Sequence, residues 1–154
     1  HEECLEPITL NIAYFYLGKW FALNGNYHKA YDYLVYATNG GLPQNYQSIY
    51  MNALAWKAVI TALGKKTDFA AAELKAIAYN LQKDFAKMEV PEMLICKTLV
   101  KSVKKGEVNW SELHSSLLEN FADEVLRQQT TEYHSVNLLV FIESIVAGKS
   151  YWKV

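Results

Sequence analysis

The stretch Asn11–Gln44 constrains this chain more than any other part of its sequence. It reads NIAYFYLGKWFALNGNYHKAYDYLVYATNGGLPQ, with two amphipathic stretches on either side of an Asn-Gly-Asn turn. Apolar residues recur there at three- and four-residue spacing, which indicates α-helices. Gly25 can adopt a positive φ, and the side chain of Asn26 can cap the second helix. The stretch therefore predicts two antiparallel helices joined by a tight turn.

Small residues stand where these two predicted helices must approach each other closely. Gly18 and Ala30 leave room for helix axes about 8–10 Å apart, and larger apolar residues fill the remaining space. The second helix is expected to end near Asn39, because two glycines and then Pro43 follow it. The residues that carry the pattern are Tyr14, Leu17, Gly18, Phe21, Ala30, Leu34, Ala37 and Pro43.

This pattern resembles one unit of the tetratricopeptide repeat family, and the resemblance covers residues 11–44 of the 154-residue chain. Phe21 stands where the family usually has tyrosine, Leu34 replaces the usual aromatic residue, and the proline comes one position late. The resemblance implies an all-α fold of antiparallel helix pairs that stack as an α-solenoid. It also implies a binding surface, since such repeats seldom perform chemistry.

Seven helices and no strands are expected from the spacing of apolar residues and from the helix-ending residues between them. They form three predicted helix pairs, at about 7–40, 46–87 and 91–129, and a last helix at 132–148. A chain of this length can hold them in a single domain, 1–154. Asn109 is expected to cap the sixth helix. The predicted helices are Pro7–Leu23, Tyr27–Thr38, Ser48–Leu63, Asp68–Lys87, Pro91–Lys105, Asn109–Gln128 and Glu132–Ala147.

Four glycines follow predicted helices at a nearly constant spacing. Gly25, Gly64, Gly106 and Gly148 are 39, 42 and 42 residues apart. This spacing exceeds the roughly 34 residues of a tetratricopeptide unit and is nearer the roughly 40–47 residues of looser α-solenoid repeats. The spacing favours a divergent array of three and a half helix pairs. An irregular helical bundle is the alternative, because glycine is the commonest residue at helix ends.

The last predicted helix is apolar on most of its circumference, whereas the terminal helix of a solenoid should present a polar face to water. Three explanations are open: the helix packs in a dimer, earlier helices cover it, or the protein continues beyond it. We expect continuation, and hence that 1–154 is a piece of a longer protein. The apolar residues are Val136, Leu138, Leu139, Val140, Phe141, Ile142, Ile145 and Val146.

Composition and charge exclude several classes of protein. Hydrophobic residues make up 51% of the chain and charged residues 20%, as in an ordered globular domain. The net charge of −1 provides no bulk attraction to nucleic acid or to an anionic membrane surface. No apolar run is long enough to span a membrane. Cys4 and Cys96 have no metal or redox spacing, so we expect buried thiols in a cytoplasmic or other intracellular protein.

Residues that could perform chemistry are few and lie at unsuitable spacings. His1, His28, His114 and His134 form no HExxH motif, and the chain has no CxxC pair. Its serines lack the context of a nucleophile elbow, and no glycine-rich phosphate loop occurs. We therefore expect a protein that is not an enzyme and that holds no metal ion and no cofactor.

A basic stripe follows the fifth predicted helix, where Lys97, Lys101, Lys104 and Lys105 recur at helical spacing. These lysines either pair with acidic residues of the next helix, which stabilises little, or form a docking strip for an acidic partner segment. No aromatic residue is interleaved with them, so a nucleic-acid interface is not expected.

Tyrosine is concentrated at one end of the chain, with seven of the eleven tyrosines between residues 14 and 46. Tyrosine can fill helix interfaces while its hydroxyl reaches water. It is also enriched at the energetic centres of protein interfaces. The sequence leaves both interpretations open: packing between helices, or a recognition surface.

The resemblance to tetratricopeptide arrays also implies where a partner would bind. In such arrays the first helix of each pair lines a groove, which maps onto Tyr16 and Lys19 in the first pair and Lys97 in the third. We expect these residues to contact a peptide or an amphipathic helix of another protein. The predicted function is a non-catalytic scaffold or adaptor. The alternative is a ligand- or peptide-sensing domain of a bacterial transcription regulator.

Overall fold

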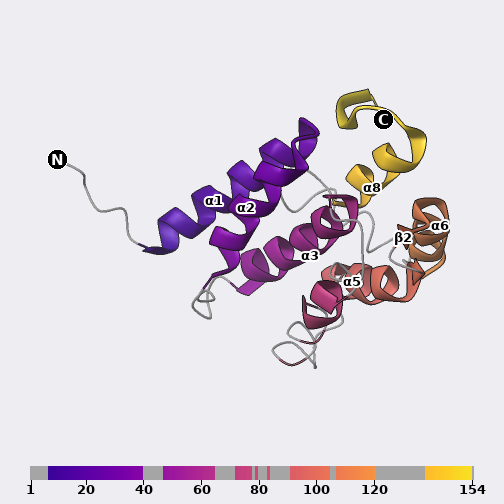
Figure 1. Ribbon diagram of the computed structural model, residues 1–154, viewed down its shortest axis with the longest axis horizontal. Coiled ribbons are helices and arrows are strands. Elements are labelled where there is room, and N and C mark those ends of the chain that lie inside the picture. Colours follow the sequence, from indigo (N-terminus) through magenta and orange to yellow (C-terminus); the bar gives the residue numbers. More distant parts are fainter. Residues whose placement is uncertain are drawn as a thin grey trace.

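The computed structural model describes residues 7–39, 47–64, 72–77, 79, 83, 91–104, 107–120 and 138–153, and these are almost all helical (Figure 1). The all-α class predicted from the sequence is therefore confirmed. The helices with described bounds are α1 (Pro7–Leu23), α2 (Tyr27–Thr38), α3 (Gln47–Gly64), α5 (Pro91–Ser102), α6 (Trp110–Asn120), α8 (Leu138–Ala147) and the short 3-10 helix η2 (Tyr151–Lys153).

The first two helices have the bounds predicted from the sequence, and α3 is longer than its prediction by one residue at each end. Of the predicted helix Asp68–Lys87, residues 72–77 are helical, as are 79 and 83; the rest lies outside the described residues. The end of the sixth predicted helix and the start of the last also fall outside them.

The prediction of no strands is wrong at one place. The helix predicted to reach the lysines before Gly106 ends at Ser102, and a two-residue strand β1 (Val103–Lys104) follows. It pairs antiparallel with β2 (Glu107–Val108), with Val103 opposite Val108 and Lys104 opposite Glu107. The segment 103–108 contains two valines, and β-branched residues favour extended backbone. Four residues are too few to show the alternation that reveals a strand.

Local sequence explains the turn between α1 and α2. Gly25 has a φ of 73°, in the left-handed region that favours glycine. The Oδ1 atom of Asn26 accepts a hydrogen bond from the backbone N–H of Lys29 at 3.2 Å, which caps α2. Asn109 caps α6 in the same way, because its Oδ1 accepts from the N–H of Glu112 at 3.1 Å. Both predicted caps are confirmed.

The first two helices approach each other closely at Gly18. A Cβ atom placed there would lie 2.7 Å from Cγ of Leu34 and 3.4 Å from the carbonyl oxygen of Ala30. Ala30 and Leu34 are completely buried. The predicted close contact of these two helices at Gly18 and Ala30 is therefore confirmed, and any larger residue at Gly18 must displace Leu34.

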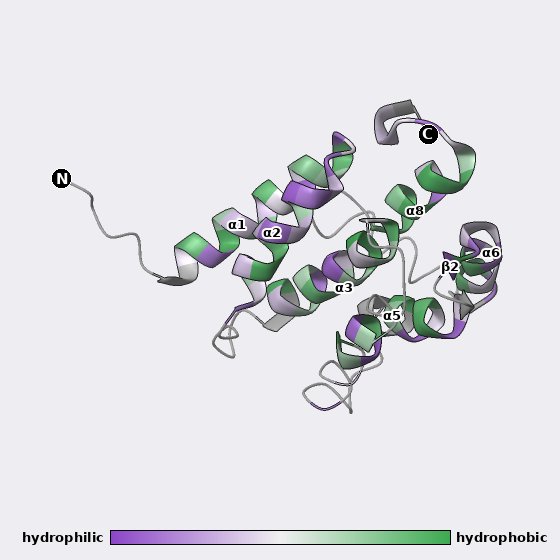
Figure 2. Ribbon diagram, viewed as in Figure 1, coloured by the Kyte–Doolittle hydropathy of each residue, from purple (hydrophilic) through white to green (hydrophobic). Residues whose placement is uncertain are grey.

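Helix α3 is the centre of the core. It packs on α2 and α5, while α5 packs on α6 and α6 on α8. Figure 1 shows α3 between the α1–α2 pair and α5, and Figure 2 shows hydrophobic residues along its length. Its buried hydrophobic side chains are Met51, Ala53, Leu54, Ala55, Trp56, Ala58, Val59 and Ile60.

Helix α8 is covered by helices that precede it. Leu138, Leu139, Phe141 and Ile142 are buried, and the ring of Phe141 lies 5.0 Å from that of Trp56. Since α8 also packs on α6, most of its apolar circumference is used within the chain. This supports the second of the three explanations for its apolar character.

Candidate functional site

Helix α1 distributes charge and apolar surface in an unusual way. Lys19 is the only charged residue between Pro7 and Leu23, and only 4% of it is exposed. The exposed face of α1 carries aromatic and apolar residues instead. Tyr16 is 55% and Trp20 57% exposed. A surface helix normally shows the opposite arrangement, which makes α1 the strongest candidate for a functional element.

The ammonium group of Lys19 is surrounded by aromatic rings. Its Nζ atom lies 4.6 Å from the ring centre of Phe15, 5.3 Å from that of Tyr16 and 5.9 Å from that of Trp56. Such cation–π contacts are favourable, above all where water is excluded. Among the residues that the structure describes, no carboxylate lies within ion-pair distance of Lys19. Burial lowers the pKa of Lys19 from 10.5 to about 8.

Trp56 joins this site to the core. It is completely buried, it contacts Lys19 of α1, and its ring lies 5.0 Å from Phe141 of α8. Its indole N–H has no hydrogen-bond partner among the described residues. The site beside Tyr16 therefore holds two buried donors, an ammonium and an indole N–H, and three aromatic rings. It can fix the position of α1 against α3, because Trp56 cannot move without disturbing both α1 and α8.

Lys19 gives the first testable prediction: Lys19→Met should stabilise the chain at pH 7 by about 1–3 kcal/mol, because an unpaired buried charge is replaced by an apolar side chain. Between about pH 8 and 10.5 the unfolded chain keeps its proton on Lys19 and the folded chain does not. The free energy of unfolding of the unaltered chain should therefore rise with pH in that window. Lys19→Met should lack this rise.

Urea unfolding at pH 7 and pH 9.5 measures both effects. Lys101→Met, at an exposed position of α5, is the matched control and should change neither the stability at pH 7 nor the pH profile. A Lys19→Met chain that is less stable at pH 7 and keeps the rise would contradict the prediction.

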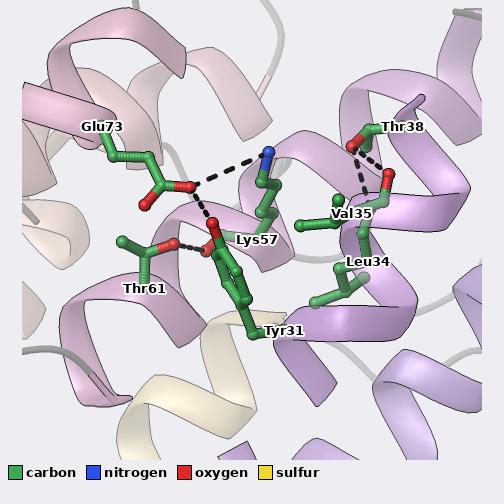
Figure 3. A network of polar contacts seen from close by, with 7 residues as sticks. All are labelled: Tyr31, Leu34, Val35, Thr38, Lys57, Thr61 and Glu73. Carbon is green, nitrogen blue, oxygen red and sulfur yellow. Dashed lines mark hydrogen bonds and ion pairs between the residues drawn. The ribbon is translucent and has the colours of Figure 1, made fainter. Parts of the chain in front are cut away.

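A second, partly buried polar cluster ties α2, α3 and the helical residues 72–77 together (Figure 3). The hydroxyl of Tyr31 donates a hydrogen bond to Oε1 of Glu73, and Nζ of Lys57 lies 4.0 Å from the same oxygen. The hydroxyl of Thr61 donates to the carbonyl oxygen of Lys57 at 2.7 Å. Burial and the bond to Glu73 raise the pKa of Tyr31. With its charges compensated inside the protein, this cluster holds helices in place.

Tyr31→Phe should lower the free energy of unfolding by about 1–3 kcal/mol, because the Glu73 carboxylate loses a buried donor. Tyr33→Phe is the control on the same helix, since no hydrogen bond of the Tyr33 hydroxyl is found in the described structure. Urea unfolding of both variants at pH 7 tests the difference. Equal losses in the two variants would show that the Tyr31–Glu73 bond contributes no stability.

Aromatic rings continue from α1 onto the neighbouring surface of α2. The rings of Phe21 and Tyr33 stack at 5.3 Å, and Tyr14 lies 5.4 Å from Tyr36. Tyr36 is 53% exposed, whereas Tyr14 and Tyr33 are partly buried. Packing between helices therefore accounts for some tyrosines, whereas Tyr16 and Tyr36 face solvent and a recognition surface stays a prediction.

Of the three residues predicted to bind a partner, the structure brings Tyr16 and Lys19 together and places Lys97 apart from them (Figure 1). Tyr16 is exposed on α1, and Lys19 is buried directly beside its ring. Lys97 is exposed on α5, and α3 lies between that helix and α1 (Figure 1). Lys97 and Lys101 form no ion pair in the described part of the chain. Pairing of the basic stripe with acidic residues is thus not seen for these two lysines.

Sequence reasoning does not identify Trp56, Trp20 or the burial of Lys19. One signal for that burial is present: Lys19 follows Phe15 by four residues and precedes Ala22 by three, which places it on the same face of α1 as these two residues. Its contact with Trp56 joins residues 37 positions apart in sequence, which helical periodicity cannot predict. Trp20 could be found as an aromatic residue on the side of α1 opposite Phe15 and Ala22.

Metal-ion chemistry and membrane insertion gain no support from the described residues. They contain no group of three or more His, Cys, Asp or Glu side chains that could hold a metal ion. None of the described helices combines the length and apolar character needed to cross a membrane. Cys96, one of the two cysteines, is buried in α5.

Comparisons of this chain with protein-family models, with curated proteins and with solved structures found no match.

Proposed function

We propose that this chain is a non-catalytic interaction module that binds a helix or peptide of a partner protein through α1. The observation that supports this most is the exposed aromatic and apolar face of α1. The largest apolar patch on a monomeric protein is often a binding site. Tyrosine and tryptophan are also the residues that most often dominate binding energy at interfaces. Here Tyr16 and Trp20 supply that chemistry from a single helix.

The fixed position of α1 also supports this proposal. Gly18 brings α1 tightly against Leu34 of α2, and Lys19 and Phe15 are buried on its inner side. A rigid surface loses little conformational entropy on binding. The aromatic rings of α1 would therefore be presented in one arrangement, which favours recognition of a partner with a complementary apolar face.

We further propose that the helices form a divergent tetratricopeptide-like solenoid. The contacts of α1 with α2, of α2 with α3 and of α5 with α6, together with the close α1–α2 pair at Gly18, support this arrangement. In this proposal Tyr16 contacts the partner directly, Lys19 holds the Tyr16 ring in place, and Lys97 belongs to a second contact on α5. In this proposal the binding surface of α1 is larger than the groove that the sequence resemblance implied, because it also includes Trp20 and Leu17.

Site-specific photo-crosslinking tests the proposed function. A photoreactive phenylalanine analogue at Trp20 should form discrete crosslinked products with protein partners, and Tyr16→Ala should remove them. The same analogue at Trp152, which is 72% exposed and lies outside α1, is the control. Identical product patterns from positions 20 and 152 would contradict the proposal that α1 is the binding element.

A further inference from the structure

Residues on the exposed face of α1 recur at the spacing of a coiled-coil seam. Thr9, Ala13, Tyr16 and Trp20 are exposed and are separated by four, three and four residues. This alternation places side chains in one line along a helix that packs against another helix. The line from Thr9 to Trp20 is about 16 Å long at 1.5 Å per residue. We call these four residues the α1 seam, and Leu17 flanks it.

The size of the side chains along the α1 seam matches an antiparallel copy of itself. Under a two-fold axis midway along the seam, Ala13 lies opposite Tyr16 of a second copy. The same axis sets Thr9 opposite Trp20. Each large ring then meets a small side chain, and the contact is self-complementary, as a two-fold interface requires. In a parallel pair, by contrast, each ring would face its own equivalent, while the two Ala13 side chains would leave a gap.

Threonine suits the end of such a seam. Its methyl group can contact the indole ring of the opposing Trp20, while its hydroxyl can donate to or accept from water at the rim of the contact. Interfaces commonly have a polar rim around an apolar centre. Thr9 is the first residue of the α1 seam, so under the two-fold axis a threonine lies at each end, and Ala13 and Tyr16 form the apolar centre.

Charge is compatible with the same arrangement. The α1 seam contains no charged residue, and Lys19 is buried on the other side of the helix. Two copies can therefore meet without opposing like charges, which otherwise disfavours pairing of identical surfaces. A strongly acidic or basic partner would find no complementary charge on this face.

The exposed area sets the expected strength of such a contact. Tyr16 and Trp20 are each more than half exposed, so their rings together offer roughly 200 Å². With the smaller seam residues and Leu17 the patch amounts to roughly 300–400 Å², the size of the largest patch on a typical monomer. A stable dimer usually buries about 800 Å² on each partner. The seam therefore suits a reversible dimer whose population depends on concentration.

We propose that the partner of the α1 seam is a second copy of this chain, packed antiparallel along the seam with Ala13 opposite Tyr16. This inference rests on the proposed function, because it identifies the protein that the face of α1 binds. It gives a role to the exposed rings of Tyr16 and Trp20 on a face of α1 that carries no charge.

Sedimentation equilibrium over a range of concentrations tests the proposal. The unaltered chain should show a reversible monomer–dimer equilibrium. Ala13→Glu should raise the dissociation constant more than about tenfold, because each carboxylate would be buried against a tyrosine ring. Ser115→Glu, at an exposed position of α6, introduces the same charge elsewhere and should leave the equilibrium unchanged. Circular dichroism confirms that the variants fold, which is expected because both positions are exposed.

A mixing experiment tests the antiparallel register. Tyr16→Lys should also be monomeric alone, but an equimolar mixture with Ala13→Glu should form a heterodimer. In that heterodimer the new Glu lies opposite the new Lys, and the other pair keeps the native Ala13–Tyr16 contact. A mixture that stays monomeric would overturn the register and with it the proposal.

Two further outcomes would overturn the proposal as well. One is an unaltered chain that is monomeric at every concentration, and the other is an Ala13→Glu dimer of unchanged strength. The proposed function fails separately. The unaltered chain could be monomeric while position 20 still crosslinks to another protein in a Tyr16-dependent way. In that case only the identification of the partner as a second copy is wrong. If position 20 forms no Tyr16-dependent crosslinks with any protein, the proposed binding role of α1 is wrong.

Discussion

Trp56→Ala is expected to lower the free energy of unfolding by about 3–5 kcal/mol, the cost of removing a large aromatic side chain from a closely packed core. Trp56 is completely buried, and its ring contacts helices on two sides: Lys19 of α1 and Phe141 of α8. The resulting cavity cannot close by movement of one helix alone. Urea unfolding followed by circular dichroism measures the loss.

Two matched variants give this prediction its controls. Trp152→Ala removes the same side chain at a position that is 72% exposed, and should change stability by less than about 0.5 kcal/mol. Trp56→Phe keeps a ring and removes an indole N–H that has no partner among the described residues, so its loss should be much smaller than that of Trp56→Ala. Equal losses for Trp56→Ala and Trp152→Ala would show that α3 does not organise the core as described.

Trp56→Ala should also change the ionisation of Lys19. Burial is what lowers the pKa of that lysine, and the Trp56 ring forms part of its enclosure. Water that enters the cavity would solvate the ammonium and move its pKa back toward 10.5. The rise of stability between about pH 8 and 10.5 should therefore be weaker in Trp56→Ala than in the unaltered chain.

The first helix pair could be predicted from sequence because its determinants are local. Gly25 and Asn26 define the turn, and Gly18 and Ala30 define the close contact, all within a few turns of helix. The structure has the α1–α2 bounds, the cap at Asn26 and the Gly18 contact as predicted. Each of these features depends on residues that lie close together in the sequence.

Long-range packing could not be predicted in the same way. Lys19 meets Trp56, Tyr31 meets Glu73, and Phe141 meets Trp56, all across many residues of sequence. No periodic pattern specifies which helix a given face will meet. For this reason the sequence alone places Lys19 in a groove, although the structure buries it beside the Tyr16 ring.

The candidate site was predictable only in part. Tyr16 is exposed, as a residue that contacts a partner must be, and its place on α1 follows from helical spacing. Trp20 escapes prediction because the groove positions that the family resemblance implies on α1 include Tyr16 and Lys19 but not Trp20. The outward seam becomes visible only when the inward positions of Phe15, Lys19 and Ala22 are known.

Gly18→Leu is expected to destabilise the chain by about 3 kcal/mol or more through overpacking. Even a Cβ atom at this position would lie 2.7 Å from Cγ of Leu34 and 3.0 Å from its Cδ2 atom. Leu34 is completely buried, so it has little space to move into, and the helices must separate instead. For a chain of this length each kcal/mol corresponds to roughly 2–4 °C in the thermal midpoint. Thermal unfolding by circular dichroism measures the shift, and an unchanged midpoint would contradict the packing of α1 on α2.

Alanine variants distinguish the effect of the Gly18–Leu34 contact from the general cost of placing glycine within a helix. Ala is favoured over Gly inside helices by about 1 kcal/mol. Gly18→Ala should nevertheless destabilise, whereas Gly64→Ala, whose Cβ would lie 3.6 Å from Cβ of Tyr27, should be neutral or stabilising. Leu34→Ala should be costly alone, yet in the double variant it should remove the penalty of Gly18→Ala, because the atoms that collide are gone. Additive losses in this cycle would show that Gly18 and Leu34 are not in contact.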